Sequence, residues 1–173
     1  SLKDAIQRKL ELMLRQNPTR TDFQQHYEKL VADYNSEKDA VNIEKTFAAL
    51  LVLADELDNE QQRAVREGLD EDTLVLFDLL IKPDLEKADI KKLKAVAVGL
   101  YETLQVQISS MENFVAKQAT RDQIRVTIYD YLFDEAKGLP DSYGEPEIEE
   151  KTEAVFAHWM MQARQASTTA AIY

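Results

Sequence analysis

Apolar residues recur at three- and four-residue steps along most of the chain, and this spacing is typical of amphipathic helices. The first such stripe consists of Leu2, Ile6, Leu10, Met13 and Leu14. The pattern predicts helices over residues 2–15, 20–34, 36–57, 59–67, 70–82, 89–109, 120–137 and 147–165. Only four glycines and four prolines interrupt it, and β-branched runs bounded by turn residues are missing. We therefore expect an all-α fold, an irregular bundle of about seven or eight helices.

Several residues at the ends of these segments have the chemistry of helix caps. Thr21 with Gln24, and Thr120 with Gln123, have the spacing of a capping box. The predicted caps are Ser36 at the start of the third helix, and Asn35 and Gly68 at the ends of the second and fourth. Residues 47–54 are apolar on nearly all sides, which predicts a central position in the bundle for this helix.

The chain reads as a single helical domain over residues 1–173. Within it we expect N-terminal helices over 1–58, a C-terminal bundle over 59–165 and a tail over 166–173. The clearest loop is the stretch 138–146, which holds two glycines and two prolines. The sequence starts inside an amphipathic pattern and without a methionine, so we interpret it as a fragment of a longer polypeptide.

The formal net charge of −11 disfavours direct binding to nucleic acid or to anionic membranes. The chain has no cysteine, which excludes disulfides, thiolate metal sites and cysteine nucleophiles and suits a reducing compartment. The longest apolar stretch is too short to span a bilayer, and no signal peptide opens the sequence. We expect a soluble, cytoplasmic protein.

Motifs for catalysis or cofactor binding are missing from the sequence. His26 and His158 each lie mid-helix with no second ligand at a convincing spacing. The acidic run that begins at Asp55 fails the calcium-loop template, because Glu60 stands where the glycine is needed and Arg66 where the bidentate glutamate is needed. Neither glycine-rich phosphate motif occurs. A carboxylate pair that meets only in space stays open, because sequence alone does not test it.

Two groups of residues are candidate contact sites. Lys87, Lys91 and Lys94 fall on one helix face, which could touch phosphate or an acidic partner or could simply be solvated. Trp159, Met160 and Met161 are consecutive on a helix and point in different directions. At least one of these three should be exposed, or covered by a partner or by the chain's own tail.

Three segments, in this order, resemble the C-terminal region of type I restriction enzyme R subunits. The first runs from Arg20–Phe23 to Tyr34–Asn35, and the second is the run Gly68–Leu80. The third begins with Leu139–Tyr143 and continues through Lys151 to Val155–His158. Two positions depart from the family pattern: Asp70 replaces the usual Ser or Thr cap, and Thr73 replaces the usual Glu.

This resemblance implies a parent subunit with a nuclease domain and two RecA-like motor domains that use ATP and Mg. The present chain would be its non-catalytic, helical C-terminal domain, which holds no cofactor. Its implied partners are the methyltransferase and specificity subunits and the motor domains of its own parent chain. The alternative is an accessory domain that contacts DNA through Lys87, Lys91 and Lys94 and guides duplex near the motor. An unrelated helical enzyme with a carboxylate site is the third hypothesis.

Overall fold

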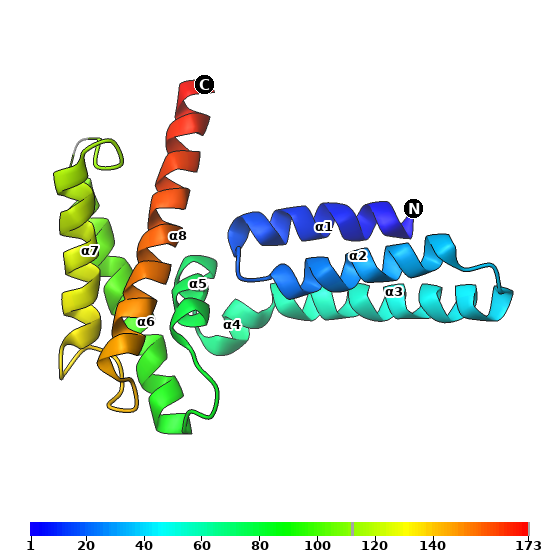
Figure 1. Ribbon diagram of the computed structural model, residues 1–173, viewed down its shortest axis with the longest axis horizontal. Helices are drawn as coiled ribbons and strands as arrows, with labels where there is room; N and C mark the ends of the chain where they lie inside the picture. The colour runs from blue at the N-terminus through cyan, green and yellow to red at the C-terminus, as the bar shows by residue number, and fades with distance from the viewer. Residues whose placement is uncertain (112, 173) are drawn as a thin grey trace. The chain divides into compact units, whose positions relative to one another are not determined.

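The computed structural model describes residues 1–111 and 113–172, with side chains described through residue 166, and is all-helical over these residues (Figure 1). The predicted all-α fold is confirmed. The chain divides into two units, Ser1–Val75 and Leu76–Tyr173, so the division lies within α5 (Glu71–Leu80). This position is later in the chain than the subdivision predicted after residue 58, and the single domain over 1–173 stays a prediction.

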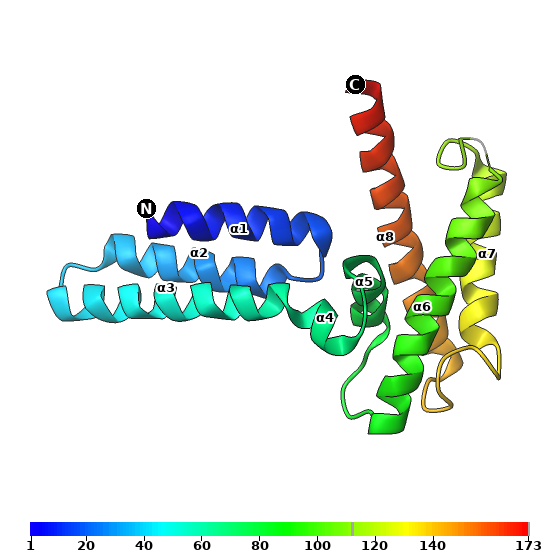
Figure 2. The same cartoon turned by 180° about the vertical axis from the view of Figure 1, so that it is seen from behind.

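In unit 1, three helices lie side by side in both views of the chain (Figures 1 and 2). They are α1 (Leu2–Gln16), α2 (Thr21–Ser36) and α3 (Ala40–Gln61), followed by the short α4 (Arg63–Glu67). Their apolar stripes meet in a core of Ile6, Leu10, Met13, Tyr27, Leu50, Leu53 and Leu57. Each fully buried leucine contributes roughly 1.5–3 kcal/mol to folding, so this core is the main source of the unit's stability.

The outer side of α3 does not fit the predicted central position of this helix. Leu50 and Leu53 are buried, but Phe47, Leu51 and Val52 are 46%, 47% and 56% exposed. Within unit 1, α3 packs mainly against α1 and α2 and continues into α4. Because two neighbouring helices cover only one side of a third, an all-round apolar sequence leaves its remaining side in solvent. The prediction that this helix is surrounded is therefore wrong for unit 1.

Two of the predicted helix ends are present. Gly68 closes α4 with a left-handed backbone, φ +71°, a conformation that favours glycine. At the start of α5, Asp70 Oδ1 accepts a hydrogen bond from the Thr73 amide at 2.8 Å. The Asp70 amide in turn donates to Thr73 Oγ1 at 3.1 Å. Thr73 therefore completes a reciprocal cap, although the sequence resemblance led us to expect Glu at this position.

The other predicted caps are wrong, because the helices begin elsewhere. Thr21 is already the first residue of α2, and the capping position before it belongs to Arg20, which makes no side-chain cap. Asn35 and Ser36 are still helical, and the cap of α3 is instead Asp39, whose side chain accepts from the Val41 amide.

The seventh predicted helix also begins earlier than its capping box indicates. α7 (Gln118–Phe133) begins two positions before Thr120. The Thr120 hydroxyl donates to the carbonyls of Phe114 and Lys117 instead of capping the helix. The predicted 59–67 helix is likewise the end of α3 followed by α4.

Unit 2 contains the rest of α5 with α6 (Lys87–Ser109), α7 and α8 (Glu145–Ile172). α7 packs against both α6 and α8. Buried core residues are Leu93, Val96, Leu100, Leu104, Ile124, Ile128, Leu132 and Val155. α8 continues through residues 166–172, where the sequence suggested a separate tail. This extension fits the alanine-rich composition of these residues and the lack of Gly or Pro among them. Over the described range, every helix falls short of the length or the apolar character that crossing a bilayer requires.

Candidate functional site

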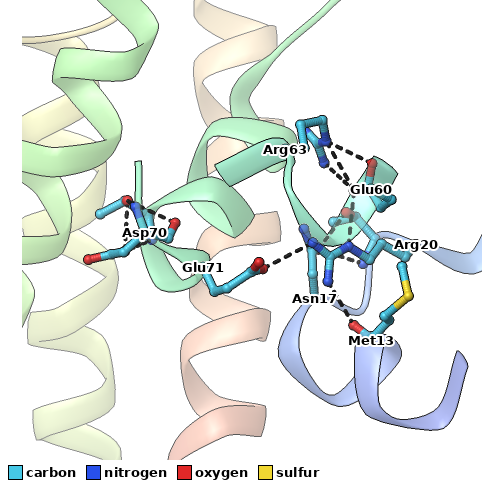
Figure 3. Close-up of polar contacts among 9 residues, drawn as sticks. Met13, Asn17, Arg20, Glu60, Arg63, Asp70 and Glu71 are labelled. Carbon is cyan, nitrogen blue, oxygen red and sulfur yellow. Dashed lines mark hydrogen bonds and ion pairs between the residues drawn. The ribbon is translucent and has the colours of Figure 1, made fainter. Parts of the chain in front are cut away.

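Arg20, the first residue of the first motif segment, lies in an ion cluster of unit 1 (Figure 3). We call it the Arg20 cluster, and it consists of Met13, Arg20, Glu60, Arg63 and Glu71. The Arg20 side chain is 2% exposed. Its Nε donates to Glu60 at 3.0 Å, its Nη2 to Glu71 at 3.0 Å and its Nη1 to the Met13 carbonyl at 3.2 Å. One guanidinium thus connects the end of α1 with the end of α3 and the first turn of α5.

The carboxylates of the cluster have unequal surroundings. The Glu60 side chain is 11% exposed and is also bound by Arg63, whose Nη2 lies 2.9 Å from Glu60 Oε1. The Glu71 side chain is 31% exposed and lies in the first turn of α5, where a carboxylate also suits the helix dipole. Because Arg20 is almost fully buried, its charge depends on these partners and on the Met13 carbonyl.

Arg20 is positioned by the tight turn between α1 and α2. Asn17 is fully buried, and its side-chain oxygen accepts from the Thr19 amide at 3.1 Å and from the Thr19 hydroxyl at 2.6 Å. The Arg20 amide donates to the Asn17 carbonyl at 3.2 Å. The turn at Asn17 and Pro18, which follows the end of α1, therefore also aims the arginine inward.

Residues of the third motif segment take part in a second polar arrangement, which lies in unit 2. We call it the Tyr143 network, and it consists of Leu80, Lys82, Tyr143, Glu147 and Lys151. The Tyr143 hydroxyl donates to the Leu80 carbonyl at 2.6 Å, and Lys151 donates to the Ile81 carbonyl at 3.3 Å. These carbonyls lie at the C-terminal end of α5, where helical partners run out. Residues far along the chain thus complete the end of this helix.

Lys82 connects the same helix end to the start of α8. Its ammonium group lies 2.8 Å from Glu147 Oε2 and 4.4 Å from the centre of the Tyr143 ring. The hydrogen bond from Lys82, helped by the Gly144 amide, lowers the pKa of Glu147. Burial, with the nearby charges of Glu147 and Asp89, raises the pKa of Tyr143 to about 12. Tyr143 is therefore a neutral hydrogen-bond donor across the ordinary pH range.

The tightest point of this region is Gly138. A Cβ atom there would lie 2.3 Å from the Leu132 carbonyl oxygen and 2.4 Å from the Asp134 carbonyl oxygen. Leu139 and Pro140, which follow, are buried. The loop that the sequence identified by its glycines and prolines therefore joins α7 to α8 with a buried first part, and Gly138 lies where the backbone leaves no room for a side chain.

The predicted partner-contact residues lie on α8 with unequal exposure. Trp159 and Met160 are buried, and Met161 is partly exposed. The Trp159 ring meets the Tyr101 ring of α6 edge-on, with centroids 5.6 Å apart and planes at 69°. Trp159 is thus engaged within unit 2, and Met161 is the member of the three that is partly open to solvent.

The predicted DNA-contact residues lie together on α6. Lys87 and Lys91 are exposed and Lys94 is partly exposed. Over the described residues, no three His, Asp or Glu side chains are arranged to hold a metal ion. His26 is exposed on α2, and His158 is partly exposed on α8.

Sequence reasoning missed the outward surface of α7. Val126 and Phe133 are each 56% exposed there, and Val126 lines two hollows, one on each side of the helix. A signal was present, because Ala119, Val126 and Phe133 recur every seven residues on the side opposite the core stripe. The core stripe of Ile124, Ile128 and Leu132 was sufficient to predict the helix, so the second stripe was not considered.

Comparison with known protein families gives a match over nearly the whole chain. A family model described as "Type I restriction enzyme HindI endonuclease subunit-like, C-terminal" matches residues 1–165. No curated protein matches the chain, and no solved structure does. The matched range contains both the Arg20 cluster and the Tyr143 network.

Proposed function

Because the chain belongs to the family of type I restriction enzyme HindI endonuclease subunit-like C-terminal domains, we propose that it is a non-catalytic assembly module of the motor subunit. In this proposal it docks the subunit on the methyltransferase and specificity subunits in the cytoplasm. ATP and Mg act in the motor domains of the parent chain, and this domain holds neither.

The observation that carries the proposal is that the motif residues form hydrogen bonds within the chain. Arg20, Tyr143 and Lys151 make hydrogen bonds to groups of the chain itself, which supports a role for these motif positions in preserving a shape. A surface that must fit a partner requires such a fixed shape.

The carboxyl groups also favour binding over catalysis. A general acid needs a raised carboxyl pKa. Among the carboxyl groups that the structure describes, those whose pKa departs from its ordinary range are Asp4, Glu37, Asp134 and Glu147, and each pKa is lowered, with hydrogen bonds as the leading cause. This supports a binding role over the hypothesis of an unrelated carboxylate enzyme.

The proposal is tested by mixing the intact motor subunit, and separately this 173-residue chain, with purified methyltransferase–specificity core on a size-exclusion column. We expect both to co-elute with the core, and a motor subunit that lacks residues 1–173 to elute alone. Normal assembly of the shortened subunit, together with no co-elution of the chain, would overturn the docking role.

A second candidate function is a direct contact with DNA, favoured by the exposed side chains of Lys87 and Lys91 on one face of α6. Such binding should weaken steeply with salt. The double change Lys87→Glu with Lys91→Glu should abolish it, whereas Lys29→Glu on α2 should have little effect. DNA binding that changes neither with salt nor with the double charge reversal would contradict this function.

A further inference from the structure

The outward face of α7 carries an apolar stripe with the spacing of a helix-binding surface. Ala119, Val126 and Phe133 are seven residues apart, and Tyr129 lies between the last two at the three- and four-residue steps. Val126 and Phe133 are each 56% exposed, and the rings of Tyr129 and Phe133 stack with centroids 5.7 Å apart. Steps of three and four residues on an exposed helix face are those that a second helix fills in helix–helix packing.

The stripe is bordered by a groove on each side. The groove between α7 and α8 has a volume of about 530 Å³ and is lined by Arg125, Val126, Tyr129, Asp130, Glu149, Thr152 and Glu153. The groove between α6 and α7 has a volume of about 500 Å³ and is lined by Gln107, Ala119, Asp122, Gln123, Val126 and Thr127. A ridge between two grooves matches the way side chains of packed helices interdigitate.

The charged residues of this surface are mostly acidic. Four carboxylates line the two grooves, those of Asp122, Asp130, Glu149 and Glu153, against the single guanidinium of Arg125. Arg125 already binds Glu153 at 2.8 Å and Asp122 at 3.3 Å. Asp130 and Glu149 border Tyr129, and burial together with the charges of Glu145 and Glu149 raises the pKa of the Tyr129 hydroxyl.

From this geometry we propose that the outward face of α7, with the α7–α8 groove, binds a basic amphipathic helix of the methyltransferase–specificity core. Apolar side chains of that helix cover Val126 and Phe133, and its Lys or Arg residues pair with Asp130 and Glu149. The inference rests on the docking function proposed above and adds the surface and the chemistry of the partner.

The charge of the surface decides between occupants. DNA phosphates and anionic lipids are repelled by the carboxylates at the groove. A neutral apolar helix would cover the stripe but leave the carboxylates around Tyr129 unpaired. A helix with both apolar and basic residues satisfies the stripe and the carboxylates together, and charge complementarity also steers its approach.

The contribution of the apolar stripe to binding is tested in the intact motor subunit with the double change Val126→Asp and Phe133→Asp. Association with purified methyltransferase–specificity core is measured by biolayer interferometry. We expect at least about tenfold weaker binding, since exposed apolar anchors dominate such contacts. The matched control is Val65→Asp on α4, a valine that is 79% exposed in unit 1, which should bind as the unaltered subunit does.

The contribution of the carboxylates at the α7–α8 groove is tested with the double change Asp130→Lys and Glu149→Lys. We expect a slower association rate and a loss of its dependence on salt, because these carboxylates steer a basic partner. The control reverses two exposed acids of α3, Glu44→Lys with Glu56→Lys, at the same change in net charge. Circular dichroism and Trp159 fluorescence verify that each variant is folded.

The remaining outcomes separate the inference from the proposed function. If the groove variants bind normally but a subunit without residues 1–173 does not, docking uses another surface and the inference is overturned while the function stands. If the subunit without residues 1–173 binds normally, both fail. If the groove variants instead break a dimer of the motor subunit and leave core binding unchanged, the surface receives a second copy, and the inference is likewise overturned.

Discussion

The two units stabilise their motif residues in opposite ways. In unit 1, Arg20 carries a charge that is almost completely buried and is held by two carboxylates and a carbonyl. In unit 2, the motif residues Tyr143 and Lys151 bind backbone carbonyls at a helix end, and the ion pair beside them, Lys82 with Glu147, is partly exposed. Removing one partner from a buried ion cluster leaves a buried charge without its counter-charge, whereas a partly exposed ion pair such as Lys82 with Glu147 contributes little because water solvates its members. The first motif is therefore the more sensitive to substitution.

The largest effect should come from Arg20→Ala. Its loss leaves Glu60 and Glu71 without their buried cation, and breaking a buried pair costs about 3–5 kcal/mol. Chemical denaturation followed by circular dichroism measures the change in the free energy of unfolding. Arg66→Ala, at an exposed position of α4, is the control and should change it by less than about 0.5 kcal/mol. Equal effects of the two substitutions would show that the buried charge is dispensable.

The same variant tests the separation of the two units. Trp159 is the only tryptophan and lies in unit 2, so its fluorescence reports unit 2 alone. We expect Arg20→Ala to shift the transition seen by circular dichroism more than the one seen by fluorescence. Coincident shifts would mean that the two units unfold together.

The next effect should come from Gly138→Ala in unit 2. The added Cβ meets two backbone carbonyl oxygens, which cannot move as a flexible side chain could. We expect a loss of about 1–3 kcal/mol or more from this overpacking. Gly144→Ala is the matched control in the same loop, because its nearest neighbour, Pro146 Cδ, lies 3.7 Å away. Thermal unfolding of both variants, monitored by Trp159 fluorescence, should separate them clearly.

A smaller effect is expected for Tyr143→Phe. The change leaves the Leu80 carbonyl without its buried donor, at a cost of about 1–2 kcal/mol near neutral pH. Because the folded-state pKa of Tyr143 is raised to about 12, its stabilising contribution is complete below the unfolded value of about 10. This contribution is lost as the pH rises from about 10 to about 12. The Tyr143→Phe variant has no hydroxyl to ionise, so its stability does not fall in this way. The difference in the free energy of unfolding between the two proteins should therefore become smaller over this range, as measured by urea denaturation at several pH values. A gap that stays constant with pH would contradict the burial of the hydroxyl.

The smallest effect is expected for Asp70→Ala, which removes the cap of α5 and should cost about 1 kcal/mol. Asp70→Ser keeps a side chain that can cap the helix and should recover most of this loss, because serine caps as well as aspartate does. Urea denaturation with both variants in parallel measures the difference. Equal stability of the alanine and serine variants would show that the Asp70 side chain does not cap the helix.

The sequence predicted the number and type of the helices well, because their core stripes are regular. The family resemblance on the three segments is also confirmed by the match over residues 1–165. The helix ends were less predictable. Thr21, Ser36 and Thr120 have suitable chemistry, but side chains and turns nearby, such as the buried Asn17 and the cap at Asp39, set the starts of α2 and α3 elsewhere.

The two polar arrangements could not be derived from local pattern. The acidic partners Glu60 and Glu71 lie 40 and 51 residues from Arg20 along the chain, and the carbonyl bound by Tyr143 lies 63 residues away. Periodicity carries no information about such distant pairs. The same holds for the grooves beside α7, which exist only after α6 and α8 have packed against it.

The distance between Leu80 and Tyr143 has a consequence for synthesis on the ribosome. The last carbonyls of α5 receive their side-chain donors from Tyr143 and Lys151, which are translated long after α5 itself. A nascent chain that has not yet delivered these residues has only water to bind at that helix end. Unit 2 therefore reaches its final form only after residue 151 has been translated, while the Arg20 cluster of unit 1 has all of its members from residue 71 onward.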